Sequence, residues 1–441
     1  MPTLLDVTDL VEFWQRSESV SGVQRVIAET APLLLAKDPK ARAVVLDRGR
    51  GVFVALSAAE TVDLVDPTGS VNRPQRAAQA AACLARARAA EPVTLDADTV
   101  AVFLGAVWIN DALMLAARAA HAAGARCVYL LYDLTPVLQT GHTATVNRLF
   151  DRYLLLVTQT GAAVPAISAS SRRDYEQHCR DHDRIPPPGG VTGLPCGLAP
   201  GQFDTSVEPW PRPYALFVGT VESRKNHLLA LRAWRVLIQR HGPDEVPDLV
   251  CVGRLGWHAE EFLTEYLATG GLGGKLSVLS TSVPDAELAR FYAHAQFTVY
   301  PSRYEGWGLP VSEALAFGKA TIVADNSSLR EAGGDLAAYV PTDDLDAFVT
   351  AIEEVGLDAA GRARAEAVIA ERGADPITWD QVAQVLAQEV ERVQSEQASQ
   401  VVPAVELGRE YVLAVSAPEP DAGYADRYFA HLLAEVRVLT N

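Results

Sequence analysis

The sequence of 441 residues has little of what would signal a metal knuckle, a disulfide scaffold or a membrane span. It contains five cysteines, and none of them forms a C-x-x-C pair. This pattern argues against a zinc knuckle and a disulfide framework, and it favours a reducing cytoplasm. No apolar run approaches the roughly 18 residues that a membrane-spanning helix needs, and the first residues lack the basic start of a signal peptide. We therefore expect a soluble, unprocessed, cytoplasmic protein.

Positive charge is also scarce, because 38 lysines and arginines stand against 55 aspartates and glutamates, giving a net charge of −17. Nucleic acids and anionic membranes are bound largely through Lys and Arg, so neither is expected as a general partner. Peripheral membrane contact at a restricted site stays open. The nine histidines show no ligand spacing. Two Asp-x-Asp occurrences, Asp96–Asp98 and Asp181–Asp183, fall in predicted loops, so we predict no metal site.

Apolar residues are abundant, at 49% of the chain, which suffices for the cores of about two domains at this length. Val100–Leu104 and Cys127–Tyr132 are continuous apolar runs on either side of an alanine-rich predicted helix. This is typical of parallel strands covered on both faces. A strand predicted over Leu4–Phe13, followed by Gly22 and a helix, resembles the opening of a Rossmann unit. The expected fold class is α/β, and Gly22 is either a phosphate contact or a plain helix cap.

The most informative stretch runs from Tyr300 to Gly318 and reads YPSRYEGWGLPVSEALAFG. A predicted strand gives way to a loop, and a predicted helix begins at Pro310, a residue that suits the first helical position. Gly306 and Gly308 allow the loop backbone to approach a ligand and to adopt positive φ. Free amides before such a helix favour a phosphate or another anion. The loop residues assigned to a ligand site are Gly306, Trp307, Gly308 and Leu309.

Two carboxylates, Glu305 and Glu313, frame this loop. Carboxylates so close to an anion site would repel a phosphate, so their presence needs a reason. Sugar hydroxyls supply one, since a carboxylate accepts strong, directional hydrogen bonds from them. An ordinary loop followed by a helix with a solvated glutamate is the alternative for a bare Glu-x7-Glu spacing.

A second cluster, Arg224 and Lys225, follows a strand predicted over Tyr214–Thr220. A diphosphate gains negative charge as a sugar leaves it, and fixed cations can neutralise this charge without a metal. At a junction between a strand and a helix, side chains and helix amides can converge on one anion. Arg254, after the next predicted strand, is a further candidate. Ordinary solvated surface is the alternative for these residues.

Asp133 follows the apolar run Cys127–Tyr132. Ligands of doubly wound sheets gather outside the carboxyl ends of the strands, so Asp133 is a candidate contact for an acceptor or a sugar. Capping of the following turn is the alternative.

The stretch Tyr300–Gly318, with Asp325–Gly334 after it, resembles the retaining glycosyltransferases of family 4, or glycosyl transferases group 1, whose fold is GT-B. The resemblance covers most of residues 1–395 and is more specific in the second half. It implies two Rossmann-like domains that face a central cleft, at 1–205 on the acceptor side and 206–377 on the nucleotide-sugar side. Residues 378–441 would hold a helix that crosses back to the first domain and an extension that the resemblance does not cover.

The resemblance also implies roles for single residues. Glu305 would lie against the donor sugar, Glu313 would bind the nucleotide ribose, and the segment at Val283 would lie against the base. The family commonly shows His-Asp where this chain has Tyr132 before its aspartate, which puts the usual role of the histidine in doubt. Many relatives have an arginine where Thr220 stands.

Together, the residues and the resemblance predict a retaining glycosyltransferase. It would move a sugar, mannose or a similar hexose or deoxyhexose, from a nucleotide-diphosphate donor to a glycan, lipid-linked or other acceptor in polysaccharide or glycoconjugate synthesis. No cofactor or metal is expected besides the donor. The alternatives are a non-catalytic scaffold or glycan-binding subunit, and an epimerase or hydrolase of nucleotide sugars. The predicted catalytic residues are Glu305, Lys225, Arg224 and Asp133. The predicted donor-binding residues are Glu313, Gly306, Trp307, Gly308, Leu309, Gly22, Arg254 and Val283.

Overall fold

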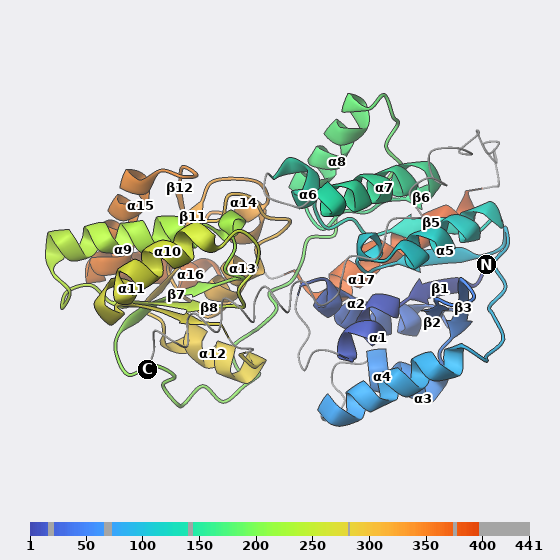
Figure 1. Cartoon of the computed structure of the whole chain (residues 1–441), viewed down its shortest axis with the longest axis horizontal. Coiled ribbons are helices and arrows are strands. Elements are labelled where there is room, and N and C mark those ends of the chain that lie inside the picture. Colours follow the sequence, from blue (N-terminus) through green and yellow to red (C-terminus); the bar gives the residue numbers. More distant parts are fainter. Residues whose placement is uncertain (16–21, 66–72, 140–143, 281–282, 374–376, 397–441) are drawn as a thin grey trace. The chain divides into compact units, whose positions relative to one another are not determined.

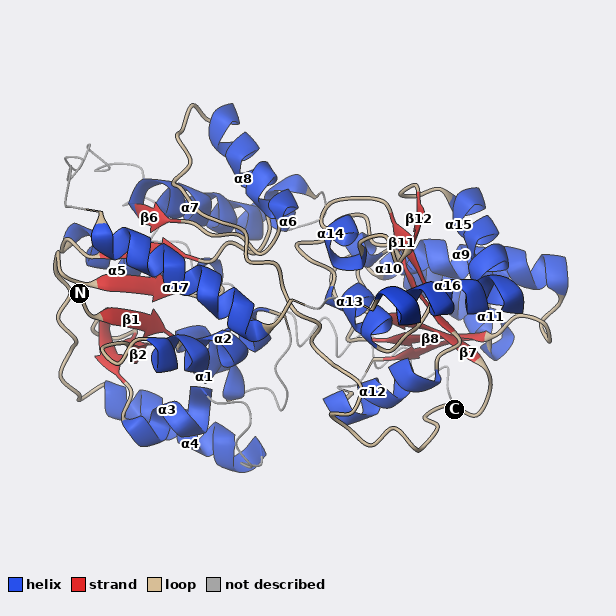
Figure 2. Cartoon of the chain, turned by 180° about the vertical axis from the view of Figure 1, so that it is seen from behind, coloured by secondary structure: helices blue, strands red, loops and turns tan. Residues whose placement is uncertain are grey.

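A computed structural model describes residues 1–15, 22–65, 73–139, 144–280, 283–373 and 377–396. Two six-stranded sheets, each covered by helices, organise these residues (Figures 1 and 2). We call the part built on β1–β6 the first lobe and the part built on β7–β12 the second lobe. Residues Met1–Glu396 form one unit by their contacts.

The sheet of the first lobe has the strand order β3-β2-β1-β4-β5-β6. All neighbours pair in parallel except β2 and β3, which pair antiparallel. Apart from the direction of β3, this is the order of a doubly wound Rossmann sheet. The strands are β1 (Thr3–Asp6), β2 (Arg42–Asp47), β3 (Val52–Ala55), β4 (Val100–Phe103), β5 (Arg126–Tyr129) and β6 (Gly161–Ala163). The helices are α1 (Thr8–Trp14), α2 (Val23–Lys37), α3 (Ala58–Val65), α4 (Arg73–Ala87), η1 (Val107–Ile109), α5 (Asp111–Ala122), α6 (Thr135–Leu138), α7 (Ala144–Thr160) and α8 (Ala169–Asp181).

The sheet of the second lobe is parallel throughout, in the order β12-β11-β10-β7-β8-β9. Counted within the lobe, this is again the Rossmann order. Its strands are β7 (Tyr214–Val218), β8 (Asp248–Val252), β9 (Leu276–Leu279), β10 (Phe297–Tyr300), β11 (Thr321–Ala324) and β12 (Ala338–Val340). Its helices are η2 (Ser223–Lys225), α9 (His227–His241), α10 (Glu260–Ala268), α11 (Gly270–Gly274), α12 (Asp285–His294), α13 (Leu309–Ala316), α14 (Leu329–Gly333), α15 (Leu345–Ala351), η3 (Ile352–Leu357) and α16 (Ala359–Arg372).

The continuous apolar runs of the sequence form the central strands of both sheets. Every residue of β4, β8 and β10 is buried, and so is every residue of β1 and β11. A strand with helices on both faces has no solvent side, so it needs apolar residues at successive positions. The two sheets follow directly from this pattern, as predicted.

The first predicted strand is a correction. β1 ends at Asp6, and the second half of the strand predicted over Leu4–Phe13 belongs to helix α1 instead. The buried apolar residues that follow β1 recur at i, i+3, i+4 and i+7, which is the spacing of one helix face rather than a strand. These residues are Val7, Leu10, Val11 and Trp14.

The last described helix, α17 (Trp379–Ser395), returns to the first lobe. It begins with a capping box between Thr378 and Gln381 and packs against α2, beside which Figure 1 shows it. Its Glu389 Oε1 accepts a hydrogen bond of 2.7 Å from the backbone N–H of Gly190. This is the crossing helix that the GT-B architecture predicts. The buried face of α17 consists of Val382, Ala383, Leu386, Val390 and Val393.

Candidate functional site

A cavity of about 570 Å³ lies at the carboxyl ends of strands from both sheets. Its walls come from the segments that follow β4 and β5 in the first lobe and β7, β8, β9 and β10 in the second. Every predicted site residue lines this cavity, although its lining does not by itself assign their roles. These residues are Gly22, Asp133, Arg224, Lys225, Arg254, Val283, Glu305, Gly306, Trp307, Gly308, Leu309 and Glu313.

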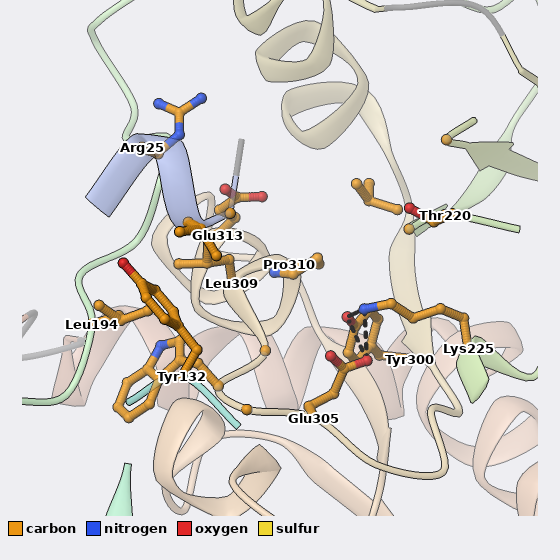
Figure 3. Close-up of a pocket in the computed structure, with 18 of the residues that line it drawn as sticks. Arg25, Tyr132, Leu194, Thr220, Lys225, Tyr300, Glu305, Leu309, Pro310 and Glu313 are labelled. Carbon is orange, nitrogen blue, oxygen red and sulfur yellow. Dashed lines mark hydrogen bonds and ion pairs between the residues drawn. The ribbon is translucent and has the colours of Figure 1, made fainter. Parts of the chain in front are cut away.

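Glu305 is bonded to both predicted phosphate-binding cations. Its Oε1 lies 2.6 Å from Lys225 Nζ, and its Oε2 lies 2.8 Å from Arg224 Nη1. The hydroxyl of Tyr300 donates a further hydrogen bond of 3.0 Å to Oε1 (Figure 3). The sequence placed these residues in one site but did not predict the ion pairs, and it missed Tyr300.

Burial and charge oppose each other in this cluster. Burial raises the pKa of Glu305, but the charges of Arg224 and Lys225 outweigh it and bring this pKa down to about 2. Burial also lowers the pKa of Lys225, and the opposing attraction of Glu305 does not restore it to its usual value. The carboxylate of Glu305 is therefore charged at any physiological pH.

Arg224 is held from three sides. Besides its ion pair with Glu305, its Nη2 lies 2.6 Å from Glu222 Oε1, and its Nη1 donates to the carbonyl of Tyr304 at 2.7 Å. Burial opposes the charged guanidinium, but Glu305 and Glu222 outweigh it and raise the pKa of Arg224. Its charge is fixed in place and already compensated.

Arg254 differs from these cations. It is exposed on the cavity wall after β8, and it forms no hydrogen bond or ion pair through its side chain to any residue that the structure describes. Its backbone carbonyl accepts a hydrogen bond of 2.8 Å from Val221, which places it beside the exposed Thr220. The cavity thus contains a cation that forms no ion pair with a described side chain.

Glu313, the second carboxylate, lies near Arg25 and apart from Glu305 (Figure 3). Burial raises its pKa to about 6, against the opposing effect of a hydrogen bond of 2.7 Å that Tyr292 donates to Oε2. A Cβ at Gly197 would lie 2.5 Å from Oε1, so a larger residue there would require this carboxylate to shift. Sequence reasoning missed Tyr292 and Gly197, because both lie far from Glu313 along the chain.

Arg25 reaches from α2 to the second lobe. Its Nη2 lies 2.6 Å from Asp285 Oδ2, and its Nη1 donates to the carbonyl of Gly197 at 3.1 Å. This arginine therefore fixes the wall next to Glu313.

Gly306 and Gly308, the two glycines of the loop before α13, have different structural roles. Gly308 caps α13 with a φ of 111°, the conformation expected of glycine. Gly306 does not have positive φ; its Cβ would lie 2.9 Å from Asp133 Cβ and 3.0 Å from the carbonyl of Tyr132, so it lets the loop approach the first lobe. Helix α13 begins one residue before Pro310, which takes its second position.

At the end of β5, Asp133 Oδ1 accepts a hydrogen bond of 2.9 Å from the backbone N–H of Thr135. Asp133 thus caps a turn, as the alternative interpretation proposed, while it also lines the cavity. The hydroxyl of Tyr132 donates to the carbonyl of Leu104 at 2.5 Å and is buried there. Tyr132 therefore lines the cavity with its ring, while its hydroxyl is committed to the backbone of the first lobe.

The remaining predicted contacts lie at helix starts. Gly22 is exposed and precedes α2 with a φ of 53°, and the half-buried Val283 precedes α12. The adjoining residues 16–21 and 281–282 lie outside the described part of the chain. Within the described part of the chain, no three or more His, Cys, Asp or Glu side chains are grouped to hold a metal ion. No described helix has the length and apolarity to cross a bilayer.

Residues 202–371 match the family model described as Glycosyl transferases group 1. This part of the chain thus resembles the group 1 glycosyl transferases. The matched residues contain the strands of the second lobe and, with them, Arg224, Lys225, Glu305 and Glu313.

Curated proteins also match part of the chain. O-antigen chain mannosyltransferase B of Escherichia coli is 36% identical over 138 residues, which is 31% of this chain and 34% of that protein. The chain spans about a third of the length of the curated relatives that match it first.

Solved structures resemble the whole described unit. Sucrose-phosphate synthase from Thermosynechococcus elongatus has a TM-score of 0.61 at 16% identity, over 89% of this chain and 99% of that chain. Anabaena Alr3699/HepE, solved in complex with UDP and glucose, has a TM-score of 0.56 at 15% identity, over 89% of this chain and all (100%) of that chain. The fold is GT-B, as predicted from the sequence.

Proposed function

We propose that the protein is a glycosyltransferase that moves a sugar from a nucleotide-diphosphate donor to a carbohydrate or glycoconjugate acceptor. The observation that carries this proposal is the grouping of the half-buried Arg224 and Lys225 with the buried Glu305 and Glu313 around one cavity between two Rossmann-like lobes. Cations suit the diphosphate, and carboxylates suit the hydroxyls of a sugar and a ribose. The mannosyltransferase among the relatives supports mannose as the sugar and polysaccharide synthesis as the setting.

The proposed mechanism retains the configuration of the sugar. Arg224 and Lys225 would stabilise the departing diphosphate, Glu305 would hold the sugar, and Glu313 would hold the ribose. An inverting transfer needs a base opposite the leaving group. Asp133, the candidate for that base, already accepts a hydrogen bond from Thr135. In the retaining route, the departing phosphate itself takes the acceptor proton.

Release of nucleotide diphosphate from a panel of nucleotide sugars, with mannose donors included, tests the function. We expect release that depends on an acceptor, that retains the anomeric configuration by NMR, and that continues in EDTA, because protein cations carry the leaving-group charge. Complete loss in EDTA, restored by Mg²⁺ or Mn²⁺, would contradict this role of the cations. Release to water alone would indicate a hydrolase, an altered donor sugar would indicate an epimerase, and no release from any donor would favour a scaffold.

Arg254 provides a test of the diphosphate position. We expect Arg254→Ala to weaken binding of a nucleotide diphosphate about 10-fold, because a charge-assisted hydrogen bond contributes about 1.5 kcal/mol or more. Titration calorimetry at low and high salt measures this loss, which should shrink at high salt because Arg254 is exposed. Arg364→Ala is the matched control, since Arg364 is exposed and does not line the cavity. Equal losses in both variants would mean that Arg254 acts only through net charge.

A further inference from the structure

We propose that Glu305 competes with the phosphates of a nucleotide diphosphate for Arg224 and Lys225, and thereby makes the protein favour the sugar-bearing donor over the bare nucleotide diphosphate. The inference rests on the proposed function. It assigns Glu305 a role in separating substrate from product, in addition to a contact with the sugar.

The geometry of the cluster supports this competition. Each carboxylate oxygen of Glu305 is bonded to a different cation, and the side chain is only 7% exposed. The side chains of Lys225 and Arg224 are 12% and 20% exposed. Both cations line the cavity, so a phosphate that approaches them there meets an ion pair already formed.

The charges of the cluster are balanced. Arg224 and Lys225 carry two positive charges, and Glu305 and Glu222 carry two negative charges. The nitrogen of Lys225 bonds one carboxylate, that of Glu305, and the hydroxyl of Tyr300. A diphosphate therefore forms a full ion pair with Lys225 only if the ion pair between Glu305 and Lys225 weakens or breaks.

The free-energy cost of replacing Glu305 by a phosphate on these cations depends on whether a sugar is present. A buried carboxylate that loses a cation without a replacement is strongly destabilised. A sugar hydroxyl restores a charge-assisted hydrogen bond to that carboxylate, so the complete donor compensates for the exchange. The bare nucleotide diphosphate has no sugar to offer, so the charge of Glu305 weakens its binding and favours its release.

The test measures affinity for both ligands in Glu305→Gln, which removes the charge and keeps the shape. We expect the bare nucleotide diphosphate to bind about 10-fold tighter than in the wild type, by calorimetry and by the product inhibition constant. The affinity for the nucleotide sugar should change less than about 3-fold. The variant loses the repulsion between Glu305 and the diphosphate, but it also loses a charge-assisted hydrogen bond to the sugar. Turnover should fall in either case and does not decide the question.

Glu222→Gln is the matched control, because Glu222 pairs with the same Arg224 but is not bonded to Lys225. We expect it to change the affinity for the bare nucleotide diphosphate less than about 3-fold. If both variants bind the bare nucleotide diphosphate equally more tightly, the change in net charge alone explains the effect, and the inference is overturned.

Unchanged or weaker binding of the bare nucleotide diphosphate in Glu305→Gln would show instead that Glu305 positions the cations. Glu305→Ala provides a second variant without a buried amide, should the glutamine variant fail to fold, and it must tighten binding too. A wild-type protein that binds neither ligand and turns over no donor would contradict the proposed function itself. A second outcome is distinct from this one: the wild type binds and turns over donors normally, but the variants do not bind the bare nucleotide diphosphate more tightly. That outcome overturns only the competition.

Discussion

Replacing Lys225 with alanine is expected to lower the turnover of a nucleotide-sugar donor by about 10²- to 10³-fold, the usual cost of removing one group that stabilises charge in a transition state. Lys225 Nζ bonds Glu305 at the wall of the cavity, and Arg224 is the other cation that bonds this carboxylate. Arg224 cannot take over, since it is already held by Glu222 and the carbonyl of Tyr304. Steady-state release of nucleotide diphosphate at saturating donor measures the effect.

Two further variants serve as controls for the Lys225→Ala measurement. Lys225→Arg retains the charge and should lose less turnover than the alanine variant. Lys37→Ala removes a lysine that pairs with Asp380, away from this cavity, and should leave turnover unchanged. Near-normal turnover in Lys225→Ala would show that the leaving group is stabilised elsewhere.

Binding of the nucleotide sugar is expected to strengthen as the pH rises from about 5 to 7, because Glu313 changes from acid to carboxylate in this range. Burial raises the pKa of Glu313 to about 6, and its immediate neighbours are Tyr292, Arg25 and Asp285. A charged carboxylate holds a ribose hydroxyl more strongly than its acid does. At pH 8, Glu313→Gln should weaken binding by about 10- to 100-fold, or 1 to 3 kcal/mol, and should remove the pH step.

The ligand and the control matter for this measurement. A nucleotide sugar is the appropriate ligand, because its diphosphate has no terminal group that titrates between pH 5 and 7. Tyr292→Phe is a useful comparison, since it removes the hydrogen bond that favours the charged carboxylate and should move the pH step upward. A pH step that persists in Glu313→Gln would assign it to another group.

The same carboxyl group affects stability in the opposite direction. Its pKa rises from 4.5 in the unfolded chain to about 6 in the folded protein. The folded state therefore retains the proton longer, and the free energy of unfolding falls by about 2 kcal/mol as the pH rises through this window. Above pH 7, Glu313→Gln should unfold at a higher temperature than the wild type while it binds the donor more weakly.

Sequence patterns predicted most of the fold because the central strands of both sheets are buried on both faces and read as continuous apolar runs. Helix α1 was missed because its apolar residues directly follow those of β1, so two periods merged into one apparent strand. The start of α13 was placed one residue late because Pro310 fits either of its first two positions.

The candidate site was predicted where residues follow strand ends, since topology alone brings such ends together. The bonds within it were not predictable in this way. The ion pairs of Glu305 depend on β7 and β10 being neighbours in the sheet, although they are separated by two strands in sequence. The pairing of Arg25 with Asp285 depends on how the first lobe meets the second. The residue pattern around Glu305 and Glu313 predicts neither the Glu305 ion pairs nor the pairing of Arg25 with Asp285.

The return of α17 to the first lobe affects the order in which the protein can mature during synthesis. Domains generally fold as units, with the N-terminal one first as the chain emerges. Here the apolar residues Val382, Leu386 and Val393 complete the core built around α2 and β1, so the first lobe lacks part of its core until residues near 395 are made. The second lobe, whose strands end with β12, can complete its sheet earlier. The first lobe is thus expected to complete its core after the second lobe has completed its sheet.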